Sequence, residues 1–126
     1  RFLKKGRPAW VPKAKMPSQT AINLIHAAGG VAVLAHPGLY RADAVIPALA
    51  DEGIDGLECW HTKHSGSAAE SYARTAGELG LVATGGSDCH GDAKGHPLIG
   101  TLRIPYEQVD QLKERCRRHR GDRAVA

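Results

Sequence analysis

The sequence predicts an α/β protein with a parallel sheet of about four strands joined by crossover helices. Short runs rich in apolar residues, at 31–35, 57–60 and 81–84, suit strands that are buried on both faces. Segments with a helical period of apolar residues alternate with these runs, and this alternation is typical of parallel sheets. The chain has 15 glycines, most of them where a strand would meet a helix, which indicates tight turns at those points.

The helix boundaries follow from residues that cap or interrupt helices. Ser18 is the expected N-cap of the first helix, which ends at Gly29-Gly30. Asp43 is expected to cap the second helix, and Gly53 ends it. The predicted elements are, in order, helix 18–28, strand 31–35, helix 43–52, strand 57–60, helix 67–79, strand 81–84, a fourth strand at 101–104 and a last helix from Pro105 through Cys116.

Residues outside these elements are expected to form a connector and a tail. Pro8, Pro12 and Pro17 each block helix continuation, so residues 1–17 are predicted to be a connector. The globular part then covers 18–120, and residues 121–126 are expected to fray.

Composition limits the kind of protein. A chain of 126 residues with 42% hydrophobic residues allows one domain with a core, and 5% aromatic residues provide no series of stacking platforms for single-stranded nucleic acid. No run approaches the roughly 18 apolar residues of a membrane span, and no export signal is visible. Three cysteines without a CxxC unit favour a reducing, cytoplasmic location.

The net charge of +4 comes from basic residues at the two ends of the chain. Such clusters attract phosphate or nucleic acid, so a nucleic-acid-binding module is one alternative, and solvated terminal arms are the simpler one. The basic residues are Lys4, Lys5, Arg7, Lys13 and Lys15 at the start, and Arg115, Arg117, Arg118, Arg120 and Arg123 at the end.

Polar side chains of the types that bind metals follow each of the first three predicted strands. Because the carboxyl ends of parallel strands meet at one edge of a sheet, these side chains are expected to converge there. His36 follows the first strand, Glu58, His61 and His64 end or follow the second, and Asp88 and His90 follow the third.

The histidines and carboxylates at these strand ends suggest a metal site. On an extended segment Asp88 and His90 would point the same way, roughly 6–7 Å apart, and could reach one ion or two neighbouring ions. His36 precedes Pro37, which restricts the histidine backbone to extended forms. Imidazole and carboxylate ligands together suit Zn, Mn or Fe, although His36 taken alone could be a capping or core residue.

The other candidates have open assignments. His61 and His64 are either exposed loop residues or groups that bind phosphate or substrate, and Glu58 is a metal ligand or supports one. His26 and His119 are expected to be structural or solvated, and His96 has no assignment. Cys89, between Asp88 and His90, is expected to belong to the core.

Three segments of the chain resemble one known family. They are Ala-Gly-Gly-Val-Ala-Val-Leu-Ala-His-Pro-Gly at 28–38, Gly-Leu-Glu-Cys-Trp at 56–60 with His-Ser at 64–65, and Gly-Leu-Val-Ala-Thr-Gly-Gly-Ser-Asp-Cys-His-Gly at 80–91. In this order they resemble the polymerase and histidinol phosphatase (PHP) family, most closely its stand-alone bacterial metal-dependent phosphoesterases. The resemblance extends from about residue 3 to residue 115.

The resemblance implies a distorted, TIM-like (β/α)7 barrel with up to three metal ions. It implies that His36, Asp88 and His90 are metal ligands and that His64 is a recurrent histidine in contact with substrate. The expected reaction is hydrolysis of phosphate esters such as nucleoside phosphates or oligonucleotide ends.

The chain also departs from that family. It contains no His-x-His motif, the first metal motif of the family, and about four of the seven strands of the barrel. Residues 18–120 are therefore expected to be the carboxyl-terminal part of the barrel, with an amino-terminal half as the expected complement. The open edge where the barrel would continue also makes homo-oligomerisation a hypothesis. Alone, the chain is expected to bind metal weakly and to be a poor catalyst. A non-catalytic PHP remnant that acts as a binding or regulatory module is the alternative.

Overall fold

The computed structural model describes residues 4–12, 14–41, 43–96 and 98–121. In this part of the chain, helices alternate with the strands of one three-stranded sheet. The strand order in the sheet is β1-β2-β3, and all strands are parallel. The elements are α1 (Ser18–Ala27), β1 (Val33–Leu34), α2 (Pro37–Tyr40), η1 (Asp43–Val45), α3 (Ile46–Asp51), β2 (Gly56–His61), α4 (Gly66–Glu78), β3 (Val82–Gly86), η2 (Gly91–Lys94) and α5 (Glu107–Gly121). The predicted α/β class is thus confirmed, whereas a closed barrel is not seen in the described part.

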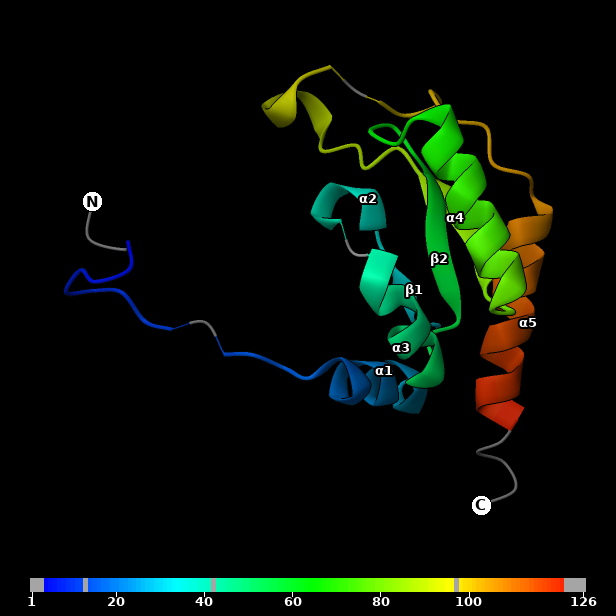
Figure 1. Ribbon diagram of the computed structural model, residues 1–126, viewed down its shortest axis with the longest axis horizontal. Coiled ribbons are helices and arrows are strands. Elements are labelled where there is room, and N and C mark those ends of the chain that lie inside the picture. Colours follow the sequence, from blue (N-terminus) through cyan, green and yellow to red (C-terminus); the bar gives the residue numbers. More distant parts are fainter. Residues whose placement is uncertain (1–3, 13, 42, 97, 122–126) are drawn as a thin grey trace.

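The sheet aligns the ends of its strands. Val33 pairs with Gly56 and Leu34 with Leu57, and β2 pairs with β3 from Gly56↔Val82 onward. A bulge at Cys59 interrupts the second pairing, because Glu58 pairs with Thr84 and Trp60 with Gly85. Within the described residues, β1 and β3 each pair on one side only. All three strands therefore end on one side of the molecule, next to α2 and η2 (Figure 1).

Two apolar clusters hold the helices on the sheet. The larger one consists of Ile46, Leu57, Cys59, Tyr72 and Ala76, and it joins α3 and α4 to β2. The smaller one consists of Ile22, Ala32 and Ile54, and it joins α1 to the amino ends of the strands. Leu57 and Cys59 have no exposed surface, in agreement with a strand buried on both faces.

Four predicted details of the secondary structure are wrong. Residues 101–104 do not form a fourth strand, because the N–H and the hydroxyl of Thr101 both donate to the Leu98 carbonyl and close a turn, and Pro105 has no N–H to pair. Ile104 nevertheless lies over β3, since a Cβ on Gly85 would come 2.6 Å from its Cδ1.

The other three corrections concern helix starts and strand length. Pro17, not Ser18, occupies the N-cap of α1, and no side chain caps that helix. Asp43 opens a separate 3-10 turn, so that α3 begins only at Ile46 with Val45 as N-cap. The strand predicted at 31–35 is reduced to Val33–Leu34, and the short helix α2 follows it directly.

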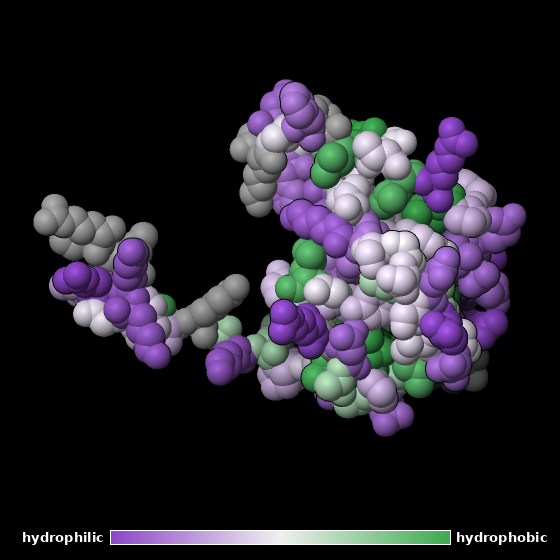
Figure 2. Space-filling view, turned by 45° about the horizontal axis from the view of Figure 1, so that its top comes forward, coloured by the Kyte–Doolittle hydropathy of each residue, from purple (hydrophilic) through white to green (hydrophobic). Residues whose placement is uncertain are grey.

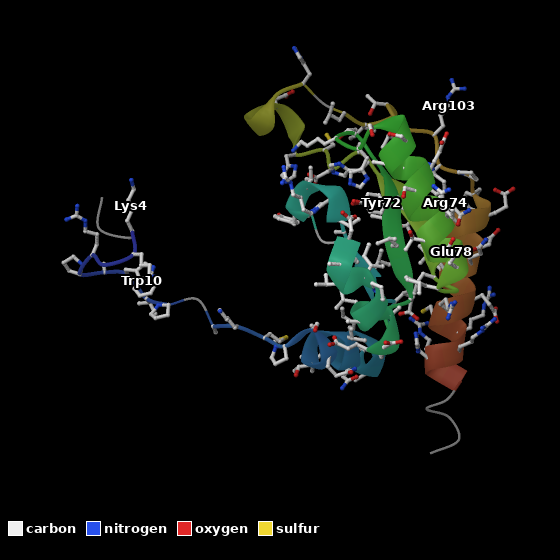
Figure 3. All side chains as sticks on the ribbon, in the orientation of Figure 1. Lys4, Trp10, Tyr72, Arg74, Glu78 and Arg103 are labelled. Atoms are coloured by element: carbon white, nitrogen blue, oxygen red, sulfur yellow. The ribbon has the colours of Figure 1, made fainter. Side chains whose placement is uncertain are left out.

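The amino-terminal segment lies apart from the globular body. Residues 4–12 and 14–17 contain turns but no helix or strand and are exposed throughout. Figure 2 shows this segment separated from the body, with hydrophilic residues prominent on it, and Lys4 and Trp10 lie there (Figure 3). The division into a connector, a barrel part and a tail stays a prediction, and residues 1–3, 13 and 122–126 lie outside the described residues.

In the described part of the chain, none of the helices is both long and apolar enough to span a membrane.

Candidate active site

The first strand leads into a histidine with a left-handed backbone. His36 has φ 31° and ψ 57° and occupies the N-cap of α2. The expectation of an extended His36 is therefore wrong, because the clash with Pro37 falls chiefly on the right-handed helical conformation. The His36 N–H donates to Glu58 Oε2 at 2.7 Å, which gives the part-buried carboxylate a partner. The Nδ1 atom of His36 is buried and has no hydrogen-bond partner.

His61 lies at the end of β2 and is 2% exposed, so it is not an exposed loop residue. Its Nδ1 accepts a hydrogen bond from the Lys63 N–H at 3.1 Å. A neutral ring with an accepting Nδ1 carries its proton on Nε2. This Nε2 is buried and 3.6 Å from Asp88 Oδ2, beyond normal hydrogen-bond distance. His61 Nε2–H is therefore a hydrogen-bond donor without a partner, next to Asp88.

His64 has the opposite arrangement of its ring nitrogens. Nδ1–H donates to the Cys59 carbonyl at 2.9 Å, so Nε2 carries the lone pair. Nε2 is buried without a hydrogen-bond partner. The ring lies 5.3 Å from the His61 ring and 5.1 Å from the Tyr72 ring, measured between centroids. Burial, with the Asp43 carboxylate nearby, raises the pKa of Tyr72 to about 12, so its hydroxyl stays protonated beside His64.

The segment after β3 turns instead of continuing extended. Asp88 has φ 51°, a left-handed conformation that aspartate tolerates better than most residues, so Asp88 and His90 do not share one face of a strand. Nδ1–H of His90 donates to the Asp88 carbonyl at 2.6 Å, which leaves the lone pair on Nε2. A histidine held in this way by a backbone carbonyl has the tautomer that metal binding requires.

Cys89 does not belong to the core as predicted. It is partly exposed, and its Sγ accepts a hydrogen bond from the Leu98 N–H at 3.4 Å. The N–H groups of Gly91 and Leu98 lower the pKa of the Cys89 thiol. The loop after β3 therefore folds back around this sulfur.

A cleft of about 400 Å³ lies at the carboxyl ends of the strands. His36, Asp88 and His90 line it, whereas His61, His64 and Cys89 are not among its lining residues. Lys63 and His96 also lie there, and no motif in the sequence had pointed to either; a histidine before Pro97 in a glycine-rich loop was the only signal for His96. The lining residues are His36, Leu39, Tyr40, Thr62, Lys63, Asp88, His90, Gly91, His96 and Leu98.

The donor chemistry of the cleft fits a divalent metal, as one part of a site. Buried nitrogens without hydrogen-bond partners belong to His36, which lines the cleft, and to His61 and His64, which do not, and a bound ion or water would satisfy such atoms. The rings are spread out, with centroids 5.6 Å apart for His36 and His61. In the described part of the chain, the single group of three ligand atoms within 4.8 Å of one another lies elsewhere. That His36, Asp88 and His90 bind metal stays a prediction.

Comparisons with known proteins agree with this geometry. No protein-family profile matches the chain. It is 36% identical over 88 residues to a phosphoribosyl 1,2-cyclic phosphate 1,2-diphosphodiesterase of Eggerthella lenta, 31% over 105 residues to a 3′,5′-nucleoside bisphosphate phosphatase of Chromobacterium violaceum, and 33% over 121 residues to the 5′-3′ exoribonuclease Rnm of Escherichia coli. These matches cover 70%, 79% and 90% of the chain, and 33%, 37% and 41% of the relatives.

Solved structures give the same result. A Bifidobacterium adolescentis protein assigned as a metal-dependent phosphoesterase matches with a TM-score of 0.69 and 30% identity, over 86% of the chain and 40% of that protein. An amidohydrolase of Chromobacterium violaceum with bound sulfate matches with a TM-score of 0.60 and 28% identity, over 86% and 42%. The chain spans less than half of these proteins. The relatives are phosphoesterases and exoribonucleases, in agreement with the resemblance of the motifs to the PHP family, and the chain corresponds to a part of them.

Proposed function

We propose that this chain supplies part of the active site of a metal-dependent phosphoesterase that acts on nucleoside phosphates or oligonucleotide ends. One observation carries the proposal: histidine, carboxylate and lysine side chains surround a single cleft at the carboxyl ends of three adjacent parallel strands. The relatives are a cyclic phosphate diphosphodiesterase, a nucleoside bisphosphate phosphatase and exoribonucleases, and their names have phosphate esters as substrates in common.

His36, Asp88 and His90 would hold divalent metal, with Zn, Mn or Fe as candidates. Bound there, the metal would polarise the phosphoryl group and make a coordinated water nucleophilic near neutral pH. Asp88 offers an anionic oxygen, and the bond from His90 Nδ1 to the Asp88 carbonyl presents the lone pair of His90 Nε2. The backbone bond to Glu58 fixes the position of His36 beside them.

The remaining polar groups of the cleft suit the phosphate itself. Lys63 carries a positive charge at the rim and would pair with a phosphate oxygen. His61 does not line the cleft, but its Nε2 lies 3.6 Å from Asp88 Oδ2, which does. His61 Nε2–H would donate a hydrogen bond to a group bound beside Asp88, with the ring held by the bond that Nδ1 accepts from the Lys63 N–H. His64 offers a lone pair and would accept a hydrogen bond from the substrate or join the metal ligands. Glu58 acts by positioning His36.

The test is hydrolysis of adenosine 3′,5′-bisphosphate and of a 5′-phosphorylated RNA oligonucleotide with added Mn²⁺. Since the chain spans less than half the length of its relatives, the assay compares the 126-residue chain with the complete gene product. We expect poor turnover by the chain alone. Turnover by the chain at the rate of a complete phosphoesterase would contradict the expectation that another barrel part is needed.

The variant Asp88→Asn should lower Mn²⁺-dependent turnover of the complete product by about 100-fold or more, because it removes the anionic oxygen next to His61. Asp92→Asn is the matched control, since Asp92 is exposed four residues away and does not line the cleft. Equal activity of both variants would contradict the proposed site. A folded complete product without metal binding or turnover would instead support the non-catalytic alternative. Completion by an amino-terminal half, homo-oligomerisation and a cytoplasmic location stay predictions.

A further inference from the structure

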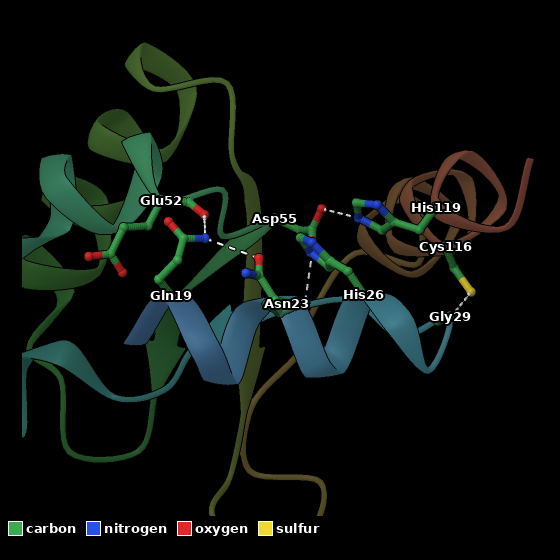
Figure 4. A network of polar contacts seen from close by, with 9 residues as sticks. Gln19, Asn23, His26, Gly29, Glu52, Asp55, Cys116 and His119 are labelled. Atoms are coloured by element: carbon green, nitrogen blue, oxygen red, sulfur yellow. Dashed lines mark hydrogen bonds and ion pairs between the residues drawn. The ribbon is translucent and has the colours of Figure 1, made fainter. Parts of the chain in front are cut away.

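A second group of ligand-type side chains lies at the opposite end of the sheet. His26 on α1, Asp55 directly before β2 and His119 on α5 come together there (Figure 4). Asp55 Oδ2 accepts from His26 Nε2–H at 2.8 Å, and Oδ1 accepts from His119 Nε2–H at 2.7 Å. Asp55 precedes β2 whereas His61 ends it, so this group is separate from the cleft by the length of the strand.

The geometry of the group is that of a preformed ligand set. Its three ligand atoms all lie within 4.8 Å of one another. The side chain of Asp55 is 3% exposed, and those of His26 and His119 are 23% and 22% exposed. The carboxylate is therefore fixed inside the fold, while solvent reaches the two imidazoles. Three protein ligands and a position open to water form the coordination that zinc accepts.

The arrangement of the two rings strengthens this interpretation. They stack with centroids 3.9 Å apart and an interplanar angle of 23°, and both present Nε2 to the same carboxylate. The Ala32 N–H donates to Asp55 Oδ2 at 2.8 Å and would hold the carboxylate in place when the imidazoles turn to an ion. Two imidazoles and one carboxylate suit Zn²⁺ and similar transition ions better than Mg²⁺ or Ca²⁺.

Neighbouring contacts keep the three segments in register. Cys116, one helical turn before His119, donates its S–H to the Gly29 carbonyl at 3.1 Å, and this contact docks α5 at the end of α1. His26 lies 29 positions before Asp55 in the sequence and His119 lies 64 positions after it. An ion bound by these three residues would therefore bridge segments that are far apart along the chain.

We propose that His26, Asp55 and His119 form a further divalent-metal site, which takes Zn²⁺ or a similar transition ion and clamps α5 to α1. Binding moves the proton of each neutral imidazole from Nε2 to Nδ1 and frees the Nε2 lone pair for the ion. Ligand bonds to a tetrahedral zinc of about 2.0–2.2 Å place the ligand atoms roughly 3.4 Å apart. Each imidazole nitrogen therefore moves several tenths of an ångström away from the carboxylate oxygen that it now bonds, at 2.8 Å for His26 and 2.7 Å for His119. The site needs no other part of a barrel and does not depend on the proposed function.

The test uses the chelator-treated 126-residue chain and Zn²⁺ as the probe, with binding measured by calorimetry and melting temperature by circular dichroism. We expect His119→Gln to weaken Zn²⁺ binding at this site by at least about tenfold and to abolish the rise in melting temperature that Zn²⁺ causes. Asp92→Asn is the control and should keep both, because Asp92 is exposed and belongs neither to the cleft lining nor to this group. Unchanged Zn²⁺ binding and an unchanged thermal shift in His119→Gln would overturn the proposal, as would loss of both in Asp92→Asn.

A direct measurement covers the case in which His119→Gln does not fold. Zn²⁺ is then titrated into the ¹⁵N-labelled wild-type chain, and the imidazole nitrogen resonances are followed. Shifts at Nε2 of His26 and His119 at stoichiometric Zn²⁺ support the site. Shifts confined to His36, His64 and His90 of the cleft overturn it.

Discussion

The Asp55 group at the amino end of the sheet and the histidines at its carboxyl end differ in whether their buried polar atoms have hydrogen-bond partners. At the amino end, the Asp55 carboxylate accepts hydrogen bonds from His26, His119 and the Ala32 N–H. At the carboxyl end, a nitrogen of each of His36, His61 and His64 is buried without a partner. An unsatisfied buried polar group lowers stability, so the carboxyl end gives up stability in the unliganded state.

This difference separates two uses of histidine within one small fold. At the amino end, Glu52 Oε2 is also buried without a partner, but the Asp55 group is fully hydrogen-bonded without a ligand and holds α1, β2 and α5 together (Figure 4). At the carboxyl end, the three histidine nitrogens have no partner in the fold. Removal of Asp55 should therefore lower the stability of the chain even without metal, whereas variants at the carboxyl end should chiefly change what the chain binds.

The largest effect is expected from Asp55→Ala. The change removes the shared acceptor of two imidazoles and a backbone N–H in a buried position, and it should lower the free energy of unfolding by about 3–5 kcal/mol. Urea unfolding in the presence of a chelator measures it. The carboxyl-end counterpart, Asp88→Asn, keeps the left-handed conformation and should cost less than about 0.5 kcal/mol, because the Asp88 side chain is 32% exposed. Equal costs would contradict the division between the two ends.

A smaller effect is expected at alkaline pH, and it concerns the core below the cleft. Burial raises the pKa of the Cys59 thiol to about 11, against 9.0 for an ordinary thiol. The folded chain holds this proton more tightly, so the resulting stability is fully present below pH 9 and is lost as the pH rises to 11. The raised pKa of Tyr72 extends the loss toward pH 12. We expect a decrease of about 2 kcal/mol in the free energy of unfolding between pH 8.5 and pH 11.

The control for this titration is Cys59→Ala, whose stability should depend less on pH between 8.5 and 11. The amino end should contribute nothing to the change. Burial opposes the ionisation of Asp55, but bonds from the Ala32 N–H, His119 and His26 outweigh it and lower its pKa, so the carboxylate is ionised throughout this range. The same pH dependence in wild type and Cys59→Ala would rule out the thiol as its source.

The sequence predicted the carboxyl end far better than the amino end. Strand ends followed directly by His36, His61 and Asp88 can be recognised locally, because parallel topology brings such residues to one edge. The group at the amino end gives no local signal, since Asp55 meets one histidine 29 positions before it and another 64 positions after it. Only the docking of α5 beside α1, a tertiary event, brings them together.

The detailed geometry of the cleft also could not be predicted from the sequence. Spacing alone predicted Asp88 and His90 on one extended segment, but the chain turns into η2 and Asp88 has a positive φ. Both side chains still line the cleft, with His90 Nδ1 3.8 Å from Asp88 Oδ1. Likewise, an alternating pattern cannot show that the turn at Leu98–Thr101 prevents a fourth strand. Local hydrogen bonds within loops decided both cases, and such bonds leave little trace in hydrophobic periodicity.

The smallest effect, and the most specific one, is expected from Gly38→Ala in α2. A Cβ at this position would lie 3.0 Å from both Cδ2 and Nε2 of His64 and 3.3 Å from the Tyr72 hydroxyl. His64 is held by the Cys59 carbonyl and cannot move away freely, so we expect a loss of about 1 kcal/mol together with a displaced ring. Gly66→Ala, with no atom within 4 Å of its Cβ, is the control.

Urea unfolding measures the loss of stability in Gly38→Ala, and the His64 ring resonances together with Mn²⁺ affinity report the displacement of the ring. Because the altered atom lies on the Nε2 side of His64, Mn²⁺ binding at the cleft should weaken in Gly38→Ala, while Zn²⁺ binding at His26, Asp55 and His119 stays unchanged. A loss of stability with unchanged His64 resonances would mean that the region around His64 is organised for packing rather than for a ligand.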